Sequence, residues 1–296
     1  MADQTLRIAC GPQTLEWSIA DPAVARDAAA RWHQFLTDRP ADLTVTVQPD
    51  SAVANGRPPW VYWPVDVVGD AQATAIQIRF GNVARVDWQT ASRVMVMVYK
   101  SDLLPAHVSL LLVDVVYRGV LAAWLPSQDG LLLHACGIMT ESAVDLFVGP
   151  SAVGKSTVAQ SVTSERVLHD DAILMLRRED RCWIYPAPWY HGSPADPIPG
   201  HQPVGRVFLL DREGASGIRR VPAYEALSFL LNRGLYGAHR VARLYQQQLV
   251  VLGTFVERHP CYWLRYRLGE EDPWRLIATA MAPTDTQSQP LTTTRA

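Results

Sequence analysis

The sequence predicts an α/β fold in which a phosphate-loop core follows a smaller α+β module. An apolar strand pattern over residues 143–148 runs directly into a G-x-x-x-x-G-K-[ST] loop, and a helix-forming run follows it. Strand and helix patterns then alternate toward the C-terminus. We expect an N-terminal α+β module over residues 1–105, a P-loop domain over residues 106–282 and a disordered tail over residues 283–296.

Composition limits the classes of function. The 296 residues are 48% hydrophobic and 19% charged, which is enough for a sizeable core. A net charge of −2 and scattered basic residues argue against nucleic acid or a charged membrane surface as a partner. The cysteines form no C-x-x-C pair, so no zinc or redox motif is expected. We expect buried thiols in a reducing cytoplasm at Cys10, Cys136, Cys182 and Cys261.

Nothing in the first residues resembles a secretory signal, since residues 1–8 lack a basic stretch followed by an apolar one. The most apolar helix candidate, residues 103–125, is interrupted by Asp114 and Arg118. These two charges favour a core helix over a membrane span. The sequence therefore predicts a cytoplasmic protein without a membrane partner.

The N-terminal module combines strand and helix patterns and contains no catalytic motif. A Gly11-Pro12 turn separates two strands, and Asp21 is a suitable N-cap before a proline-initiated helix. The expected elements are strands at 5–10, 14–19, 43–47, 74–80 and 93–99, a helix at 22–37 and a loop at 52–64.

The second part contains the chemistry. Its expected strands are 131–139, which includes His134, then 143–148, 166–168, 172–176, 183–185, 206–211 and 262–268. Its expected helices are 106–124, the loop helix to about residue 163, 222–231, 238–255 and 274–281. A proline-rich segment, residues 186–199, is expected to be a loop of the kind that lines sites.

The loop chemistry follows from its residues. Gly149 and Gly154 allow the tight bend that brings backbone N–H groups to phosphate oxygens. The amine of Lys155 can reach the β- and γ-phosphates, and the hydroxyl of Ser156 can ligate Mg²⁺. The expected nucleotide-binding residues are Gly149, Pro150, Ser151, Ala152, Val153, Gly154, Lys155, Ser156 and Thr157.

A phosphoryl-transfer site also needs acidic groups. Asp170 and Asp171 follow the first short strand after the loop helix, and two adjacent carboxylates are best explained by a nearby cation. Asp211 ends an apolar strand and competes for the metal role, but Arg212-Glu213-Gly214 indicates a hairpin turn there. We therefore favour the Asp170-Asp171 pair, with one member on Mg²⁺ and the other as general base.

Neighbouring polar side chains are weaker candidates. A lone histidine such as His134 in an apolar strand is usually a core residue, and strand alternation should turn His169 away from Asp170. Arg206 could neutralise transferring phosphate, although no motif singles it out. The aromatic residues Trp189 and Tyr190 and the adjacent His191 could meet an acceptor or simply pack on the proline-rich loop.

The phosphate loop, the early Asp170-Asp171 pair and the upstream Leu132-Leu133-His134-Ala135 resemble the catalytic domain of HPr kinase/phosphorylase. They resemble more closely its stand-alone relatives in peptide natural-product pathways, including lasso-peptide tailoring kinases. The resemblance covers residues 130 to about 190. It implies a fold akin to phosphoenolpyruvate carboxykinase, ATP-dependent serine kinase activity, and His134 beside the phosphates. The Leu-Glu-x-Arg-Gly signature is absent, and Thr157 replaces a frequent glutamate, which argues against HPr as the substrate.

The resulting hypothesis is a kinase that uses ATP and Mg²⁺. Lys155 would act on the phosphates, Ser156 and Asp171 would hold the metal, and Asp170, Asp171 and His134 would complete the catalytic group. The acceptor would be a hydroxyl on a peptide or small molecule, in natural-product biosynthesis, and a homo-oligomer is possible. Two alternatives remain: a nucleotide-binding switch that engages a partner, and a degenerate member whose loop holds phosphate for other chemistry.

Overall fold

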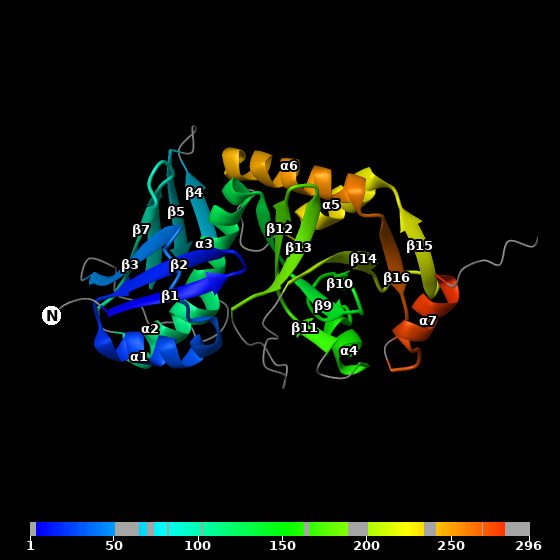
Figure 1. Cartoon of the computed structure of the whole chain (residues 1–296), viewed down its shortest axis with the longest axis horizontal. Coiled ribbons are helices and arrows are strands. Elements are labelled where there is room, and N and C mark those ends of the chain that lie inside the picture. Colours follow the sequence, from blue (N-terminus) through cyan, green and yellow to red (C-terminus); the bar gives the residue numbers. More distant parts are fainter. Residues whose placement is uncertain are drawn as a thin grey trace, which may run out of the picture.

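The computed structural model describes residues 4–50, 65–69, 74–81, 83–101, 103–162, 166–188, 201–233, 241–267 and 269–281. Two mixed β-sheets lie side by side, one built from the N-terminal third and one from the remainder (Figure 1). The protein is therefore a mixed α/β structure, as the sequence predicts in general. The expected loop at residues 52–64, the Trp189–His191 segment and the expected tail lie outside the described residues.

The first sheet has seven strands in the order β1-β2-β3-β7-β6-β5-β4. Strands β2, β3 and β7 are parallel to one another, and the remaining pairs are antiparallel. Alternate side chains are buried, which is typical of a sheet with one covered face. The strands are β1 (Gln4–Cys10), β2 (Gln13–Ile19), β3 (Leu43–Asp50), β4 (Val65–Gly69), β5 (Ala75–Phe80), β6 (Ala84–Gln89) and β7 (Val94–Lys100).

The helix α1 (Pro22–Arg31) begins as predicted, because the Asp21 carboxylate accepts hydrogen bonds from the N–H groups of Ala23 and Val24. It ends six residues earlier than expected. Trp32 is fully buried against two other aromatic rings, and a 3₁₀ turn, η1 (His33–Phe35), then redirects the chain. Burial of a large indole thus overrides the helical periodicity.

A long apolar helical stretch connects the two sheets. It consists of α2 (Pro105–Leu110), a π-helical segment η2 (Leu111–Val116), α3 (Tyr117–Trp124) and a 3₁₀ turn η3 (Leu125–Gln128). Residues 105–128 are long and apolar enough to cross a membrane, yet 88% of the most apolar window is buried inside the protein. This confirms the expectation of a core helix. The sequence did not predict the π segment.

The second sheet contains nine strands and carries the phosphate loop. Strands β10, β14 and β16 are parallel, with β9 antiparallel to β10. The strands are β8 (Gly130–Leu133), β9 (Ala135–Met139), β10 (Val144–Val148), β11 (Val167–His169), β12 (Ile173–Arg178), β13 (Arg181–Pro186), β14 (Gln202–Leu210), β15 (Gly217–Val221) and β16 (Cys261–Arg265). The helices are α4 (Lys155–Gln160), α5 (Ala223–Leu231), α6 (Ala242–Arg258) and α7 (Pro273–Ala280).

Both faces of the parallel strands are covered. Leu146 and Val148 of β10 pack with residues of α5 and α6, whereas Phe147 between them packs with residues of α4 and α7. Figure 1 shows α6 running along the top of the second sheet and α4 and α7 below it. A strand buried on both faces shows a continuous apolar run, which is the pattern that predicted β10.

Several expected elements differ from the structure. The predicted strand 131–139 is broken at His134, the loop helix α4 ends at Gln160, and α6 begins and ends later than expected. Strands β4, β6 and β15 were not predicted. β15 carries exposed Arg219 and Arg220 and lacks apolar alternation, but Val86 and Trp88 of β6 do alternate and could have revealed it.

One of the hydrophobic clusters spans both sheets. It contains residues of the first sheet, the connecting helices and one face of β8 and β12, represented by Leu132 and Leu174. The predicted boundary at residue 105 coincides with the start of α2. Whether the two parts are separate domains stays a prediction.

The four cysteines are buried, free thiols, as expected. Burial raises the pKa of Cys10 and of Cys261 to about 12, so both stay protonated at neutral pH.

Candidate functional site

The phosphate loop follows β10 and is tightly wound. A side chain at Gly149 would place its Cβ 2.7 Å from Val153 Cγ1 and 3.1 Å from Leu210 Cβ, so only glycine fits there. Gly154 has φ 124° and Ala152 has φ 62°, and both values lie in the left-handed region. Helix α4 starts immediately afterwards at Lys155. The sequence motif therefore forms the strand–loop–helix arrangement that a phosphate site requires.

Two side chains from neighbouring segments hold the loop. The Tyr266 hydroxyl donates to the Gly154 carbonyl at 2.9 Å, and burial raises the pKa of this phenol to about 12. The guanidinium of Arg212, just after β14, donates to the carbonyl of Ala152. These contacts fix the loop backbone. No sequence motif indicated either residue.

Lys155 is buried, and its side chain folds back onto the backbone of its own loop. Its Nζ donates to the carbonyls of Gly149 at 2.9 Å and Pro150 at 2.8 Å. Burial lowers the pKa of Lys155 to about 8, and the negative charge of Asp171 opposes part of that shift. The amine is therefore held at the mouth of the loop and lies within the electrostatic reach of Asp171.

His134 and the two acids lie where the chain changes strand partners. His134 connects β8, which pairs with β12, to β9, which pairs with β10. Asp170 and Asp171 make the corresponding connection from β11 to β12. Because Val148 is opposite Ala135, the residues that follow and precede them, Gly149 and His134, are brought to the same edge of the sheet. The topology thus places the predicted site residues at one end of β9.

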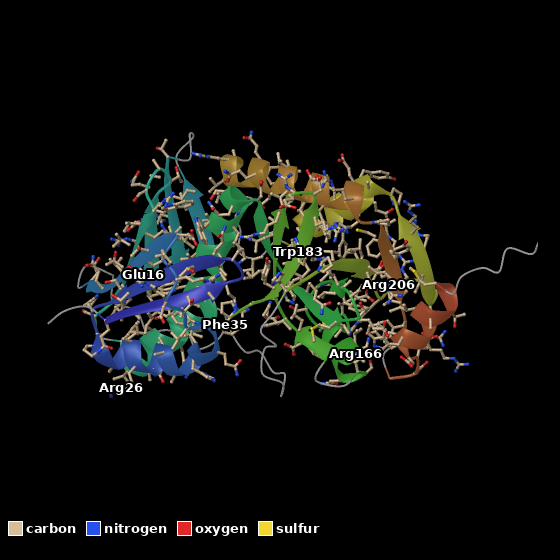
Figure 2. All side chains as sticks on the ribbon, in the orientation of Figure 1. Glu16, Arg26, Phe35, Arg166, Trp183 and Arg206 are labelled. Atoms are coloured by element: carbon tan, nitrogen blue, oxygen red, sulfur yellow. The ribbon has the colours of Figure 1, made fainter. Side chains whose placement is uncertain are left out.

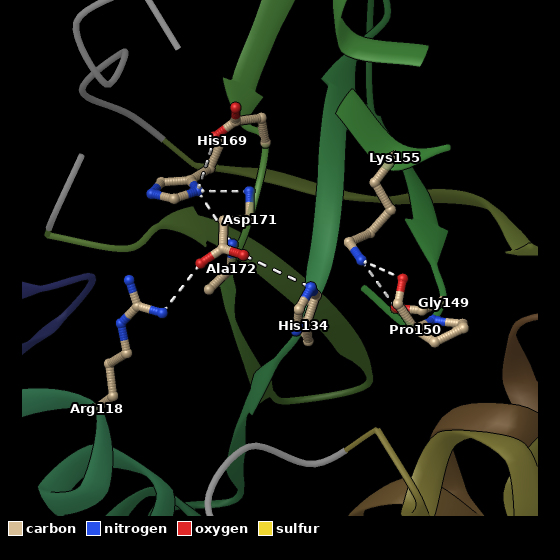
Figure 3. Close-up of polar contacts among 9 residues, drawn as sticks. Arg118, His134, Gly149, Pro150, Lys155, His169, Asp171 and Ala172 are labelled. Atoms are coloured by element: carbon tan, nitrogen blue, oxygen red, sulfur yellow. Dashed lines mark hydrogen bonds and ion pairs between the residues drawn. The ribbon is translucent and has the colours of Figure 1, made fainter. Parts of the chain in front are cut away.

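Asp171 contacts both Arg118 and His134. Its Oδ2 accepts a hydrogen bond from Arg118 at 3.0 Å, and its Oδ1 lies 3.5 Å from His134 Nε2 (Figure 3). Arg118 as a whole residue is 8% exposed, so this ion pair is largely desolvated. We call Arg118, His134 and Asp171 the acid cluster. Sequence reasoning treated Arg118 only as a charge in an apolar helix. That charge was itself a signal, because a buried arginine needs an anionic partner.

The orientation of His169 differs from the expected one. Strand alternation predicted that it would turn away, but its Nδ1 lies 4.0 Å from Asp170 Oδ1 and accepts hydrogen bonds from the N–H groups of Asp171 and Ala172. Both distances are 3.1 Å. The ring therefore fixes the backbone turn that carries the two acids, with Nδ1 unprotonated (Figure 3).

The charges of Asp170 and Lys155 both act on the Cys136 thiol of β9. Burial raises the pKa of the Cys136 thiol, and the charge of Asp170 raises it further while that of Lys155 lowers it. Cys136 lies on β9, two residues after His134. Asp170 and Lys155 therefore both lie close to the same strand.

The remaining metal candidate, Ser156, lies exposed at the second position of α4. Within the described ranges, no group of three or more His, Cys, Asp or Glu residues could hold a metal ion by itself. A Mg²⁺ that binds with a triphosphate needs only one or two protein ligands, because phosphates and water complete its octahedron. The donor set of Ser156 and Asp171 fits that case.

Two other candidates have structural partners. Asp211 Oδ2 accepts two hydrogen bonds from Arg265, at 3.1 and 2.8 Å, and Asp211 starts a turn. This turn is not a hairpin as expected, since β16 lies between β14 and β15. Arg206, labelled in Figure 2, donates hydrogen bonds from Nε and Nη2 to the buried carboxylate of Asp145. It is therefore not aimed at the loop as the phosphate hypothesis required.

Comparison with known proteins finds no matching protein-family model and no matching curated sequence.

Proposed function

We propose that the protein is an ATP-dependent kinase that transfers the γ-phosphate to a hydroxyl of a peptide or small molecule. One observation carries the proposal: the acid cluster and a wound phosphate loop lie at the same end of β9, and the Asp171 charge acts on Lys155. The resemblance of the loop and the two acids to HPr kinase/phosphorylase and its natural-product relatives supports the same chemistry. We also propose that the protein is cytoplasmic.

The loop would bind the triphosphate. Its N–H groups and the start of α4 favour negative charge, and Lys155 would leave the Gly149 and Pro150 carbonyls for phosphate oxygens. Ser156 and Asp171 would hold Mg²⁺, whose charge offsets that of the β- and γ-phosphates. The geometry at Gly149 and Gly154 is consistent with this role, because a side chain at Gly149 would clash with Val153 and Gly154 has a φ of 124° that favours glycine.

The two acids differ in their surroundings. Arg118 stabilises the charged form of Asp171, which suits a metal ligand. Asp170 lies beside an unprotonated His169 Nδ1, which cannot donate a proton to it. Asp170 is therefore the better general base. His134, next to Asp171 Oδ1, would hold that oxygen in place or contact a phosphate oxygen.

Transfer exchanges one P–O bond for another. The acceptor oxygen attacks the γ-phosphorus and forms a new P–O bond, and the bond between the γ-phosphorus and the β–γ bridging oxygen breaks. The hydroxyl proton passes to Asp170, and ADP leaves with the bridging oxygen. Lys155 offsets the negative charge that accumulates on the departing oxygens.

The test is incubation with γ-labelled ATP, Mg²⁺ and a panel of serine-containing peptides and hydroxylated small molecules, followed by mass spectrometry. We expect an acceptor to gain one phosphoryl group, with Lys155→Ala as the blank. Exposed Arg178→Ala is the matched control for loss of a cation and should transfer normally. Full transfer by the double variant Asp170→Asn, Asp171→Asn would remove the kinase proposal. Nucleotide-dependent binding of a partner without any phosphorylated product would favour the switch alternative.

A further inference from the structure

Arg118 reaches the site from α3, the connecting helix that packs against the first sheet. We infer that Arg118 is a positioning residue through which the first sheet fixes the orientation of the Asp171 carboxylate. This inference rests on the proposed function, because it assigns a purpose to the orientation of a metal ligand. It goes beyond that function in making the N-terminal half part of the catalytic apparatus.

The contacts of Asp171 divide its two oxygens. Oδ2 is engaged by Arg118 at 3.0 Å, whereas Oδ1 is turned toward His134. A carboxylate held at one oxygen by a guanidinium cannot rotate freely, so Oδ1 is the oxygen presented for a metal ion. Figure 3 shows Arg118 and His134 approaching Asp171 from different elements.

The neighbours of Arg118 anchor the same helix to the first sheet. Tyr117 stacks on Trp17 and contacts Trp32, with ring centroids 5.7 and 5.3 Å away, and its hydroxyl lies 2.5 Å from Cys10 Sγ. These partners belong to β1, β2 and the end of α1. Tyr117 thereby fixes the axial position and rotation of α3 one residue before the arginine.

Gly119, the residue after Arg118, packs against a different strand of the first sheet, β5. A Cβ at this position would lie 2.9 Å from Phe80 Cζ and 3.2 Å from Ile78 Cγ2, both on β5. The glycine allows close contact between α3 and the sheet, because a larger residue would push the two apart. Residues 117 and 119 therefore bind the first sheet while residue 118 binds the site.

The test measures ATP affinity and phosphoryl transfer as functions of Mg²⁺ concentration in the full chain. In Arg118→Met we expect the half-maximal Mg²⁺ concentration to rise about 100-fold, and in Arg118→Lys about 10-fold, because Lys keeps the positive charge but lacks the planar guanidinium that fixes the direction of the carboxylate. ATP affinity without Mg²⁺ should stay unchanged, since the loop is intact. A purely structural role would lower the melting temperature without moving the Mg²⁺ dependence.

Arg206→Met is the matched control, since it also removes an arginine that pairs with an aspartate, here the buried Asp145 of β10. It should destabilise the protein and leave the Mg²⁺ dependence unchanged. Wild-type Mg²⁺ dependence in Arg118→Met would overturn the positioning role and leave the kinase proposal standing. Wild-type protein that binds ATP equally well with and without Mg²⁺ and transfers no phosphate would overturn both.

A second pair of variants tests the link to the first sheet and serves if Arg118→Met does not fold. Gly119→Ala should shift α3 away from Phe80 and raise the Mg²⁺ requirement severalfold. Adding Phe80→Leu shortens the opposing side chain and should restore it. An unchanged requirement in Gly119→Ala would contradict the link.

Discussion

The phosphate loop and the acid cluster are assembled in opposite ways. The loop is one continuous segment whose Lys155 contacts carbonyls only five and six residues away. The acid cluster joins Arg118 to Asp171 across 53 residues and depends on two strand connections, one through His134 and one through Asp170 and Asp171. A local site is set by its own backbone, whereas a dispersed site inherits its geometry from the whole fold.

This difference has a consequence for mutation. Changes in the loop should act on nucleotide binding directly, because Lys155 bonds within its own segment and the loop backbone is held by Arg212 and Tyr266. Changes around the acid cluster should act on metal use and transfer, and they can originate far away. Variants of the two regions separate these two kinds of effect.

The largest effect is expected for Lys155→Ala. Removing the amine takes away the charge that stabilises the departing phosphate oxygens, so transfer should fall about 10³-fold. ATP affinity should weaken as well, because the amine also contacts the bound phosphates. Steady-state kinetics and direct titration of ATP measure the two effects. Unchanged ATP affinity would contradict the local character of the loop.

Asp170→Asn should be nearly as damaging to transfer but different in kind. Loss of the general base should lower kcat about 10²-fold, while ATP affinity changes less than about twofold. Quench-flow or steady-state assays with a titration of ATP distinguish these outcomes. If ATP affinity fell and kcat did not, Asp170 would belong to the nucleotide site and the proposed division of the acids would be wrong.

The pH dependence of ATP binding should report on Lys155. In the free protein its pKa is about 8, and bound phosphate favours the protonated amine. The dissociation constant should therefore be constant below pH 8 and rise by up to about tenfold per pH unit above it, because binding must then take up a proton. Lys155→Ala should bind weakly with no such slope between pH 7 and 9. A flat wild-type profile over that range would exclude this amine from phosphate binding.

The smallest effect on activity is expected at the contact between the two halves. Gly11 has φ 63°, and a Cβ there would lie 2.8 Å from the Tyr185 ring. Gly11→Ala should lower the free energy of unfolding by about 3 kcal/mol, from backbone strain and overpacking together. Gly81→Ala, with φ 57° and open space around it, should cost only about 1 kcal/mol. Chemical denaturation measures both, and equal losses would contradict the close contact with Tyr185.

The same contrast explains what the sequence could predict. The motif and the apolar run of β10 identified the loop, because each signal lies in adjacent residues. The acids were singled out for a similar reason, since they directly follow a short strand. Arg118 and Tyr266 were missed as site residues, since their roles depend on which helix and strand reach the loop in space. The break at His134 was also missed, because an apolar run does not reveal where a strand exchanges its partners.

The central claim is that the loop and Asp171 serve one magnesium-bound triphosphate. The most direct measurement is the dissociation constant of ATP with and without Mg²⁺ in the wild-type protein and in Asp171→Asn. We expect Mg²⁺ to strengthen binding in the wild type and to have little influence in the variant, whose affinity without Mg²⁺ stays close to that of the wild type. An equal response to Mg²⁺ in both proteins would contradict the claim.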